Sequence, residues 1–308
     1  MTTPDEAKAI VRRWNDEGWS GGKYDLVYEL IAPTTTVHGA GGQAVGMGPE
    51  GFRDLIQTWR EAFPDGYMTV DDLIVETDVV AIRNTWHGTH TGKDFYGIPA
   101  SGAWVDVTSI GLDRVKDGKV VEGWGELDMV GMMQKLGALP LVGPGAVTAG
   151  KSSEWGPSTG VTGPSTTSPE ENKDILARFV QALDAGDEAT LSEVVDVERF
   201  VDHNPVWGTE GWAGVVGTAA MLRAAMPDLE VRPERDIAVG EGDQVCLHSV
   251  ITGTHTGADL FGAPASGKQV AWTHSDFARI VAGKIVERWV SADTLTLFQQ
   301  TGVVGGGS

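Results

Sequence analysis

Gly88-Thr89-His90-Thr91-Gly92 returns residue for residue as Gly253-Thr254-His255-Thr256-Gly257, 165 positions further along the chain. The same offset relates Gly118-Lys119-Val120-Val121-Glu122 to Gly283-Lys284-Ile285-Val286-Glu287. A register kept over this distance is not a bias of composition. Units of a solenoid repeat span about 20–50 residues, whereas a small domain spans about 100–150 residues. The sequence therefore predicts one domain written twice.

The predicted boundaries follow from local composition. We expect a first domain over residues 1–139 and a second over residues 169–303. Residues 140–168, between them, are rich in Pro, Gly, Ser and Thr, which is typical of a linker. The Gly-rich end, residues 304–308, is expected to be a flexible tail.

Each half changes from helical to strand patterns along its length. In the first half, apolar side chains at helical spacing predict three helices, of which the third, over residues 49–63, carries Trp59. Strand patterns follow, with a hairpin signal at Asp117-Gly118, and a short last helix ends at Gly137. Helices followed by an antiparallel meander make an α+β domain. We expect two tandem cone-shaped α+β barrels, in each of which a curved antiparallel sheet wraps around the helices and leaves a pocket.

The charge and the cysteine content exclude several classes of function. The formal net charge is -20, whereas nucleic acids and anionic membranes bind basic surfaces, so we expect neither as a partner. No apolar stretch reaches the roughly 20 residues of a membrane span. The first residues lack the pattern of a signal peptide, so we expect a cytoplasmic protein. Cys246 is the only cysteine, which excludes intramolecular disulfides and thiolate metal clusters.

Motifs for cofactors and metals are missing as well. No spacing of His, Asp and Glu resembles a metal-ligand set. The Gly-rich turns are not followed by helices, as phosphate loops and dinucleotide fingerprints require. The chain also lacks the Gly-x-Ser-x-Gly elbow of a nucleophilic serine. We therefore expect no metal and no cofactor.

The last strand of each domain carries candidate acid–base residues. Trp124 and Asp128 share a strand face in the first domain, as Trp289 and Asp293 do in the second, because alternate side chains point to the same side. We expect these faces to line the pockets, where burial beside Trp would raise the pKa of the aspartate into an acid–base range. The alternative is that Asp128 and Asp293 cap the final helix of each domain.

Histidines are the second set of candidates. His38 and His203 come at the end of the first short strand of each domain, where a neutral imidazole could bind a substrate oxygen or share a proton with the aspartate. His90 and His255 sit where a strand runs into a Gly-rich turn. There a structural role, bonded to the backbone, is the alternative to substrate contact.

His274 differs from the other histidines because it has no counterpart in the first half, where Ser109 holds the matching position. Trp272, His274 and Asp276 share one strand face. This face could make the second pocket chemically different from the first.

Together these residues resemble the SnoaL-like polyketide cyclase family, also described as ester cyclases, within the nuclear transport factor 2-like superfamily. The resemblance covers nearly all of both domains and none of the linker. Its carriers in the first half are Gly88–Gly92, Gly97-Ile98-Pro99, Arg114, Asp117–Glu122, Trp124, Asp128 and Gln134–Gly137. In the second half they are Gly253–Gly257, Gly262, Pro264, Arg279, Gly283–Glu287, Trp289, Asp293 and Gln299–Gly302.

The resemblance implies an acid–base enzyme that needs no cofactor. In these cyclases the aspartate at the end of the last strand shuttles the proton of an intramolecular aldol ring closure, a role that would fall on Asp128 and Asp293. The early-strand histidine of the family, a contact to a substrate oxygen, corresponds to His38 and His203. Family members also pair through their sheets. The two domains are therefore expected to pair as a pseudo-dimer within the chain, with further homodimerisation left open.

The chain departs from the family pattern at two places. The family's Pro-Thr-Gly reads Pro-Ala-Ser-Gly in both copies, beginning at Pro99 and at Pro264, which reshapes that loop. The stretch Asp202-His203-Asn204-Pro205 is closer to the family pattern than Val37-His38-Gly39. This difference favours the second pocket as the active one.

We therefore expect a cyclase or isomerase that acts on a hydrophobic, polyketide-like biosynthetic intermediate, since the eleven Trp suit a flat apolar ligand. One alternative is an epoxide-opening hydrolase or cyclase, with Glu126 or Asp276 as a second pocket carboxylate. Another is a non-catalytic module that binds a small molecule, in which the aspartates are caps. The residues expected to act in catalysis are Asp293, Asp128, His203, His38 and His274. Those expected to bind substrate are Trp289, Trp124, Trp272, His255, His90, Asn204, Trp207 and Trp59.

Overall fold

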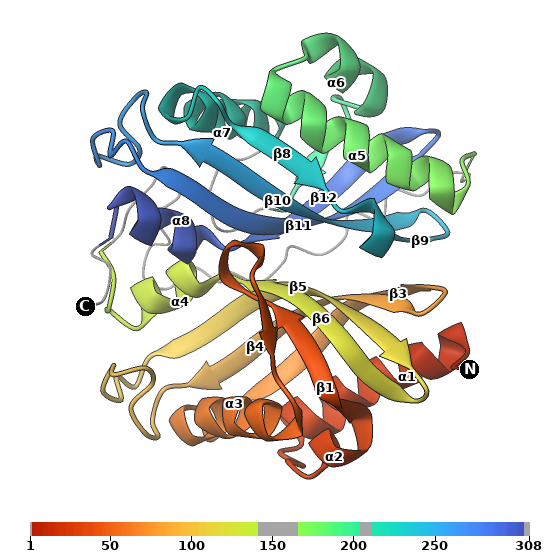
Figure 1. Ribbon diagram of the computed structural model, residues 1–308, viewed down its shortest axis with the longest axis vertical. Helices are drawn as coiled ribbons and strands as arrows, with labels where there is room; N and C mark the ends of the chain where they lie inside the picture. The colour runs from red at the N-terminus through yellow and green to blue at the C-terminus, as the bar shows by residue number, and fades with distance from the viewer. Residues whose placement is uncertain (1, 141–165, 204–210, 305–308) are drawn as a thin grey trace. The chain divides into compact units, whose positions relative to one another are not determined.

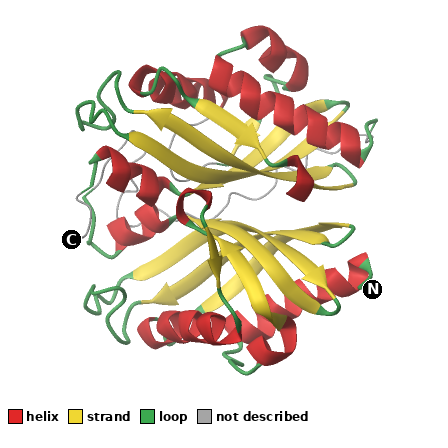
Figure 2. Cartoon of the chain, viewed as in Figure 1, coloured by secondary structure: helices red, strands yellow, loops and turns green. Residues whose placement is uncertain are grey.

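The computed structural model describes residues 2–140, 166–203 and 211–304 of the chain. The chain divides into two compact units, one formed mainly by residues up to 140 and the other by residues after 165. In each unit the long helices gather on one face of a sheet (Figure 2), which confirms the expected α+β class. Most of the expected linker lies outside the described residues, and the predicted boundaries stay predictions.

The first domain begins with helices and ends with long strands, as the sequence predicts (Figure 1). Its elements are α1 (Pro4–Arg13), a π-helical segment η1 (Trp14–Ser20), α2 (Leu26–Leu30), β1 (Ile31–His38), β2 (Ala44–Gly46), α3 (Pro49–Ala62), β3 (Tyr67–Glu76), β4 (Val79–Thr89), β5 (Trp104–Lys116), β6 (Lys119–Leu127) and α4 (Met129–Lys135).

The strand order of the first sheet is β2-β1-β6-β5-β4-β3. The expectation of an antiparallel sheet holds for every neighbouring pair except β1 and β6, which run parallel. The chain passes through α3 and the meander before β6 returns beside β1, and a crossover of this length permits parallel pairing.

The second domain repeats this plan (Figure 1). Its sheet has the order β7-β12-β11-β10-β8, with β9 paired to β10. Its elements are α5 (Pro169–Ala185), α6 (Glu188–Val194), β7 (Val201–Asp202), α7 (Gly211–Ala225), β8 (Glu230–Pro233), a 3-10 turn η3 (Arg235–Ile237), β9 (Val239–Glu241), β10 (Gln244–Thr254), β11 (Gln269–Val281), β12 (Lys284–Ala292) and α8 (Thr294–Thr301).

The offset seen in the sequence holds in the strand register. Ser109 pairs with Leu127 between β5 and β6, and the residues 165 positions later, His274 and Ala292, pair between β11 and β12. The predicted hairpin turn is present at Asp117-Gly118, where φ is 50° and 76°. Positive φ at both central residues is the geometry of a type I′ turn, which suits the twist of the flanking strands. Repeated register confirms that one domain is written twice.

The interior of the first domain is rich in aromatic side chains. Trp59 contacts Trp19 and Trp86 edge to face, with ring centroids 6.1 and 5.5 Å apart. The core cluster of the second domain is mainly aliphatic, with Leu176, Val180 and Leu247 among its buried side chains. The two domains therefore share a backbone plan but fill the space between helices and sheet differently.

Candidate active site in the second domain

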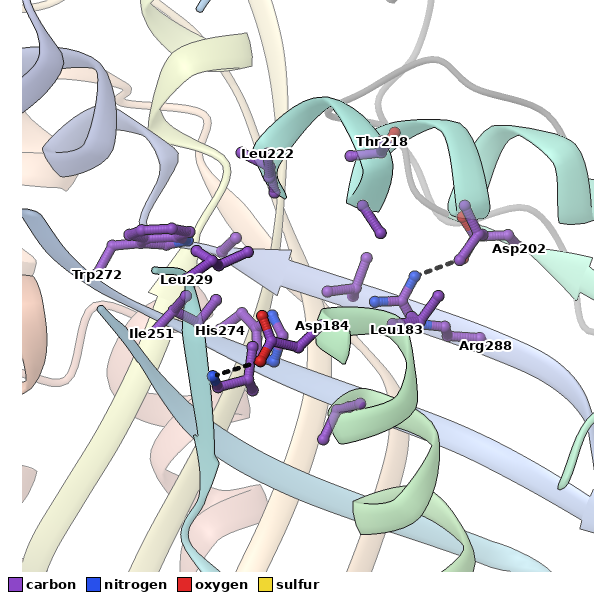
Figure 3. A pocket seen from close by; sticks show the side chains of 16 residues that line it. Leu183, Asp184, Asp202, Thr218, Leu222, Leu229, Ile251, Trp272, His274 and Arg288 are labelled. Carbon is purple, nitrogen blue, oxygen red and sulfur yellow. Dashed lines mark hydrogen bonds and ion pairs between the residues drawn. The ribbon is translucent and has the colours of Figure 1, made fainter. Parts of the chain in front are cut away.

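A pocket lies between the helices and the sheet of the second domain (Figure 3). The pocket is open to solvent at its mouth, and its cavity volume is about 100 Å³, below the range of about 300–1,000 Å³ that is usual for small-molecule sites. The lining residues are Val180, Leu183, Asp184, Asp202, Val215, Thr218, Ala219, Leu222, Leu229, Val231, Ile251, Trp272, His274, Arg288, Val290 and Ala292.

A chain of charged groups crosses the floor of this pocket. Arg288 donates from Nε to Oδ1 of Asp276 at 2.6 Å and from Nη1 to Oδ1 of Asp202 at 3.4 Å. Nε2 of His274 lies 3.2 Å from the other oxygen of Asp276. The side chain of Asp276 is 0% exposed, so it lies behind the pocket, where its carboxylate contacts both the guanidinium of Arg288 and the imidazole of His274. The result is an imidazole and a guanidinium fixed by one buried carboxylate.

Burial shifts the acid–base properties of two pocket carboxyls. Burial raises the pKa of Asp202 to about 6, although Arg288 acts against the shift. Burial also raises the pKa of Asp184, against a hydrogen bond from the backbone N–H of Val231. A carboxyl that titrates near pH 6 can hold and release a proton close to neutral pH, which is what general acid catalysis requires.

Three oxygens in the pocket wall have no hydrogen-bond partner among the described residues. Oδ2 of Asp202, Oδ1 of Asp184 and Oγ1 of Thr218 are buried, and none of them meets a hydrogen-bond partner among the described residues. Buried polar atoms in native proteins are nearly always hydrogen-bonded, to water or a ligand where the protein provides no partner. The three oxygens come from three different elements, β7, α5 and α7. All three residues line the pocket, which makes it the candidate ligand site of the second domain.

The first domain does not reproduce this polar set. The positions that match Asp202, His274, Asp276 and Arg288 are Val37, Ser109, Gly111 and Gly123, and Trp19 matches Asp184.

The helix-facing side of the first sheet carries one carboxyl, Asp113, directly opposite Gly123 and Val80 on the neighbouring strands. Burial raises the pKa of Asp113 to about 7. Asp113 has neither an imidazole nor a guanidinium beside it at the positions that match the second-domain set. The helix-facing side of the first sheet therefore carries a single acid, whereas the second domain brings together Asp202, His274, Asp276 and Arg288.

The expected pocket-facing side of the last strand is wrong for the second domain. Arg288, Val290 and Ala292 line the pocket, whereas Trp289 and Asp293 belong to the other parity of β12. The pattern misleads because β12 is buried on both faces, so that apolar alternation does not mark the inner one.

Asp128 and Asp293 occupy the N-caps of the last helices, as in the alternative considered for them. Asp128 accepts a hydrogen bond from the N–H of Gly131 at 2.8 Å, and Asp293 accepts one from Thr296 at 3.3 Å. Burial raises the pKa of Asp128 to about 6, against the bond from Gly131. Neither aspartate lines the described pocket, and a catalytic role for them stays a prediction.

Separating the cap role of Asp128 from an acid–base role needs two substitutions. We expect Asp128→Ala to lower the free energy of unfolding by about 1 kcal/mol, because the N–H of Gly131 loses its acceptor. Asp128→Asn should retain most of the stability, since Asn caps helices as well as Asp does. Urea denaturation and a turnover assay check both variants. Normal stability with lost turnover in Asp128→Asn would contradict a purely structural role.

His38 and His203 occupy equivalent places away from the pocket. Each ring stacks on the Trp of the last strand, at 4.7 Å on Trp124 and 4.8 Å on Trp289, with planes 5° apart. Nε2 of each lies 2.9 Å from a glutamate, Glu122 in the first domain and Glu287 in the second. These contacts hold the early strand against the last strand, and the expected substrate contact stays a prediction.

The other expected residues divide between the core, the turns and the pocket. His90 and His255 are buried and lie near backbone carbonyls of their Gly-rich turns, those of Lys93 and Ala258. Trp59 lies in the aromatic interior of the first domain. Trp272 and His274 line the described pocket. Asn204 and Trp207 lie outside the described residues.

Sequence reasoning missed four polar residues of the pocket. Asp184, Asp202, Thr218 and Arg288 were not among the candidates, although three of them are ionisable. A signal for Asp202 and Arg288 was present, because they are charged where the first copy has Val37 and Gly123. Positions at which two copies of a repeat differ in charge are informative about a site that only one copy holds.

The described residues contain no cluster of three His, Cys, Asp or Glu side chains suited to a metal ion. Among the helices of the same residues, none combines the length and the apolar character of a membrane span.

Comparisons with known proteins place the chain in a family. The model of the SnoaL-like polyketide cyclase family matches residues 9–136 and again residues 173–301. A search of curated proteins finds no match. Among solved structures, the chain is similar to a candidate SnoaL-like polyketide cyclase from Jannaschia sp. CCS1, with 30% identity and a TM-score of 0.41 over 46% of this chain and 97% of that one.

Two proteins from Streptomyces are also similar. IdmH, a candidate polyketide cyclase from Streptomyces antibioticus, is 31% identical, with a TM-score of 0.38 over 42% of this chain and 98% of its own. AclR, a candidate hydroxylase from Streptomyces galilaeus, is 27% identical, with a TM-score of 0.42 over 46% of this chain and 91% of its own. Because the family model matches most of the chain in two consecutive stretches, this protein belongs to the SnoaL-like polyketide cyclase family as a tandem member with the nuclear transport factor 2-like fold.

Proposed function

We propose that the pocket of the second domain catalyses an acid–base ring closure on an apolar, ketone-bearing intermediate of the polyketide type. Family membership supports a cyclase-type function on a small molecule. The observation that carries the finer proposal is that His274, Asp202 and Arg288 line one largely apolar pocket. A base, an acid and an oxyanion stabiliser are the groups that an aldol ring closure needs.

His274 is the base of the proposed reaction. Asp276, whose carboxylate oxygen lies 3.2 Å from Nε2, stabilises the imidazolium that forms when His274 takes up a proton. The imidazole of His274 takes a proton from a carbon next to a substrate carbonyl, and the guanidinium of Arg288 stabilises the enolate oxygen that forms. The enolate carbon then attacks a second carbonyl of the same molecule and closes the ring.

Asp202 is the acid that completes the reaction. It gives its proton to the alkoxide formed on ring closure, so the product is an isomer of the substrate. A proton that passes from His274 to Asp202 through solvent restores the starting state. The proton shuttle thus falls on residues of the pocket wall rather than on Asp293 at the helix cap.

The pH profile tests the role of Asp202. Its pKa of about 6 means that the carboxyl is protonated below that pH and ionised above it. We expect kcat for the cyclisation of a linear polyketone to fall above pH 6, by about tenfold per pH unit, as the acid is lost. Asp202→Asn should lower the rate at pH 5.5 and remove this limb, while Asp259→Asn, at an exposed position outside the pocket, should keep it. An unchanged limb in Asp202→Asn would contradict the assignment.

Epoxide opening is a second candidate because the pocket holds two carboxyls of raised pKa, Asp184 and Asp202. The expected second carboxyls were Glu126 and Asp276, but Asp276 lies behind the pocket and Glu126 belongs to the first domain.

Turnover in ¹⁸O-labelled water separates the two reactions. Epoxide hydrolysis places the label in the product and depends on Asp184, whereas ring closure by the aldol route forms its new bond without water. Binding of aromatic ketones and epoxides without turnover would indicate a non-catalytic module.

A further inference from the structure

The second-domain pocket has unfilled capacity to accept hydrogen bonds. The side chain of Asp202 is 1% exposed, and its Oδ2 has no partner among the residues that the structure describes. Oδ1 of Asp184 and Oγ1 of Thr218 are in the same situation. A carboxylate accepts hydrogen bonds and donates none, while a hydroxyl can do both. Above pH 6, where Asp202 is ionised, a ligand that fills this part of the pocket must therefore bring donors.

The charges of the pocket also favour a ligand that carries no negative charge. Asp184 and Asp202 line it and Asp276 lies behind it, while Arg288 is the one Lys or Arg among the lining residues. The guanidinium is already shared between two carboxylates, at 2.6 Å from Asp276 and 3.4 Å from Asp202. An anionic ligand would lose its hydration and meet an excess of negative charge, and an unpaired buried charge is costly.

The apolar wall of the pocket determines how a ligand ring can lie relative to these acceptor oxygens. Trp272 and Ile251 lie on one side of the pocket in Figure 3, and Asp202 with Arg288 on the other. Trp272 is 2% exposed and belongs to the inner wall. An aromatic ring beside Trp272 would thus direct its polar substituents towards the carboxyl side.

We propose, building on the proposed function for the choice of site, that the natural ligand of this pocket carries hydroxyl or protonated amino groups on an apolar ring system and bears no carboxylate. Asp202 and Asp184 accept hydrogen bonds from these groups, and Thr218 adds a third contact. A protonated amine adds charge pairing to the hydrogen bond, so amines bind more tightly than alcohols. Free carboxylic acids are excluded as substrates of the site.

Three probes that share one ring test the inference: 2-naphthylmethylamine, 2-naphthalenemethanol and 2-naphthoic acid. Calorimetric titration of the full chain at pH 7.5, where Asp202 with its pKa of about 6 is ionised, gives the three dissociation constants. We expect the amine to bind at least tenfold more tightly than the acid, with the alcohol between them. Equal or tighter binding of the acid would overturn the inference and indicate an anion site built on Arg288. Failure of all three probes to bind would overturn it as well.

Substitutions then connect the preference with the two carboxyls. In Asp184→Asn/Asp202→Asn we expect the amine to lose its advantage over the alcohol, because the amides carry no negative charge. Asp259→Asn removes an exposed carboxylate outside the pocket and should leave the preference unchanged. If the double variant unfolds, the two single variants are titrated instead, and each should reduce the preference. A preference that survives in all of them would overturn the assignment.

The titrations with the three probes measure binding without turnover, so their outcome does not depend on whether the protein catalyses the proposed ring closure. A chain that prefers the amine but cyclises no polyketone would retain this inference and contradict the proposed function. A chain that cyclises polyketones but prefers the acid would do the reverse.

Discussion

His274→Gln is expected to lower kcat for cyclisation by about 10²- to 10⁴-fold, the range that a positioned acid–base group contributes. Glutamine has a similar length and still forms hydrogen bonds, but it cannot take up a proton at neutral pH. KM should change little, because the apolar wall around Trp272 and Ile251 is left intact. The measurement is steady-state turnover of a linear polyketone, with binding of an unreactive aromatic analogue followed in parallel. Equal losses of turnover and of binding would contradict a role in the chemical step.

Arg288→Leu is expected to lower the free energy of unfolding by about 3–5 kcal/mol, because it leaves buried carboxylates without their cation. Asp276 and Asp202 are 0% and 1% exposed, so water does not replace the guanidinium. Without Arg288, the pKa of Asp202 in the folded state lies further above its unfolded value, because the guanidinium no longer opposes the effect of burial. The loss of stability should therefore be large at pH 8 and shrink as the pH falls below about 6, where Asp202 is protonated in the folded state of both proteins.

An apolar replacement of the whole group provides the matched control. In Asp202→Val/Asp276→Ala/Arg288→Leu no buried charge is left unpaired, and such replacements are often neutral or stabilising. We expect the triple variant to recover most of the stability that Arg288→Leu loses, without recovering turnover. Denaturant titrations at pH 5 and pH 8 check both variants. A deficit of Arg288→Leu that is the same at both pH values would contradict the electrostatic explanation.

The fold could be predicted from the sequence because repetition and periodicity both report on it directly. The offset from Gly88–Gly92 to Gly253–Gly257 gave the two domains, and the hairpin signal at Asp117-Gly118 is a turn with positive φ at both residues. The parallel pairing of β1 with β6 could not be predicted in this way. That pairing depends on where the meander brings its last strand, and no local pattern records it.

The site was predictable only in part. His274 and Trp272 were identified because His274 has no counterpart and Trp272 shares its strand face. The inner face of β12 was assigned wrongly because this strand is buried on both sides, so its alternation carries no information about the pocket. Asp184 is on a helix, and its approach to the sheet is set by tertiary packing that spacing does not reveal.

Divergence between the two copies explains why one domain holds the constellation. Arg288 and Asp276 of the second sheet correspond to Gly123 and Gly111 of the first. Because of these two glycines, the first domain lacks the guanidinium and the carboxylate that lie beside the imidazole of His274 in the second domain. The first domain retains the fold and keeps only Asp113 as an acid on the matching face.

The location of the reaction is tested most directly by measuring turnover of His274→Gln and Asp113→Asn side by side on the same linear polyketone. Each variant removes an acid–base group from the helix-facing side of the sheet in one domain. Our account expects His274→Gln to lose turnover and Asp113→Asn to keep the native rate. Native turnover in His274→Gln together with its loss in Asp113→Asn would contradict the account and assign the reaction to the first domain.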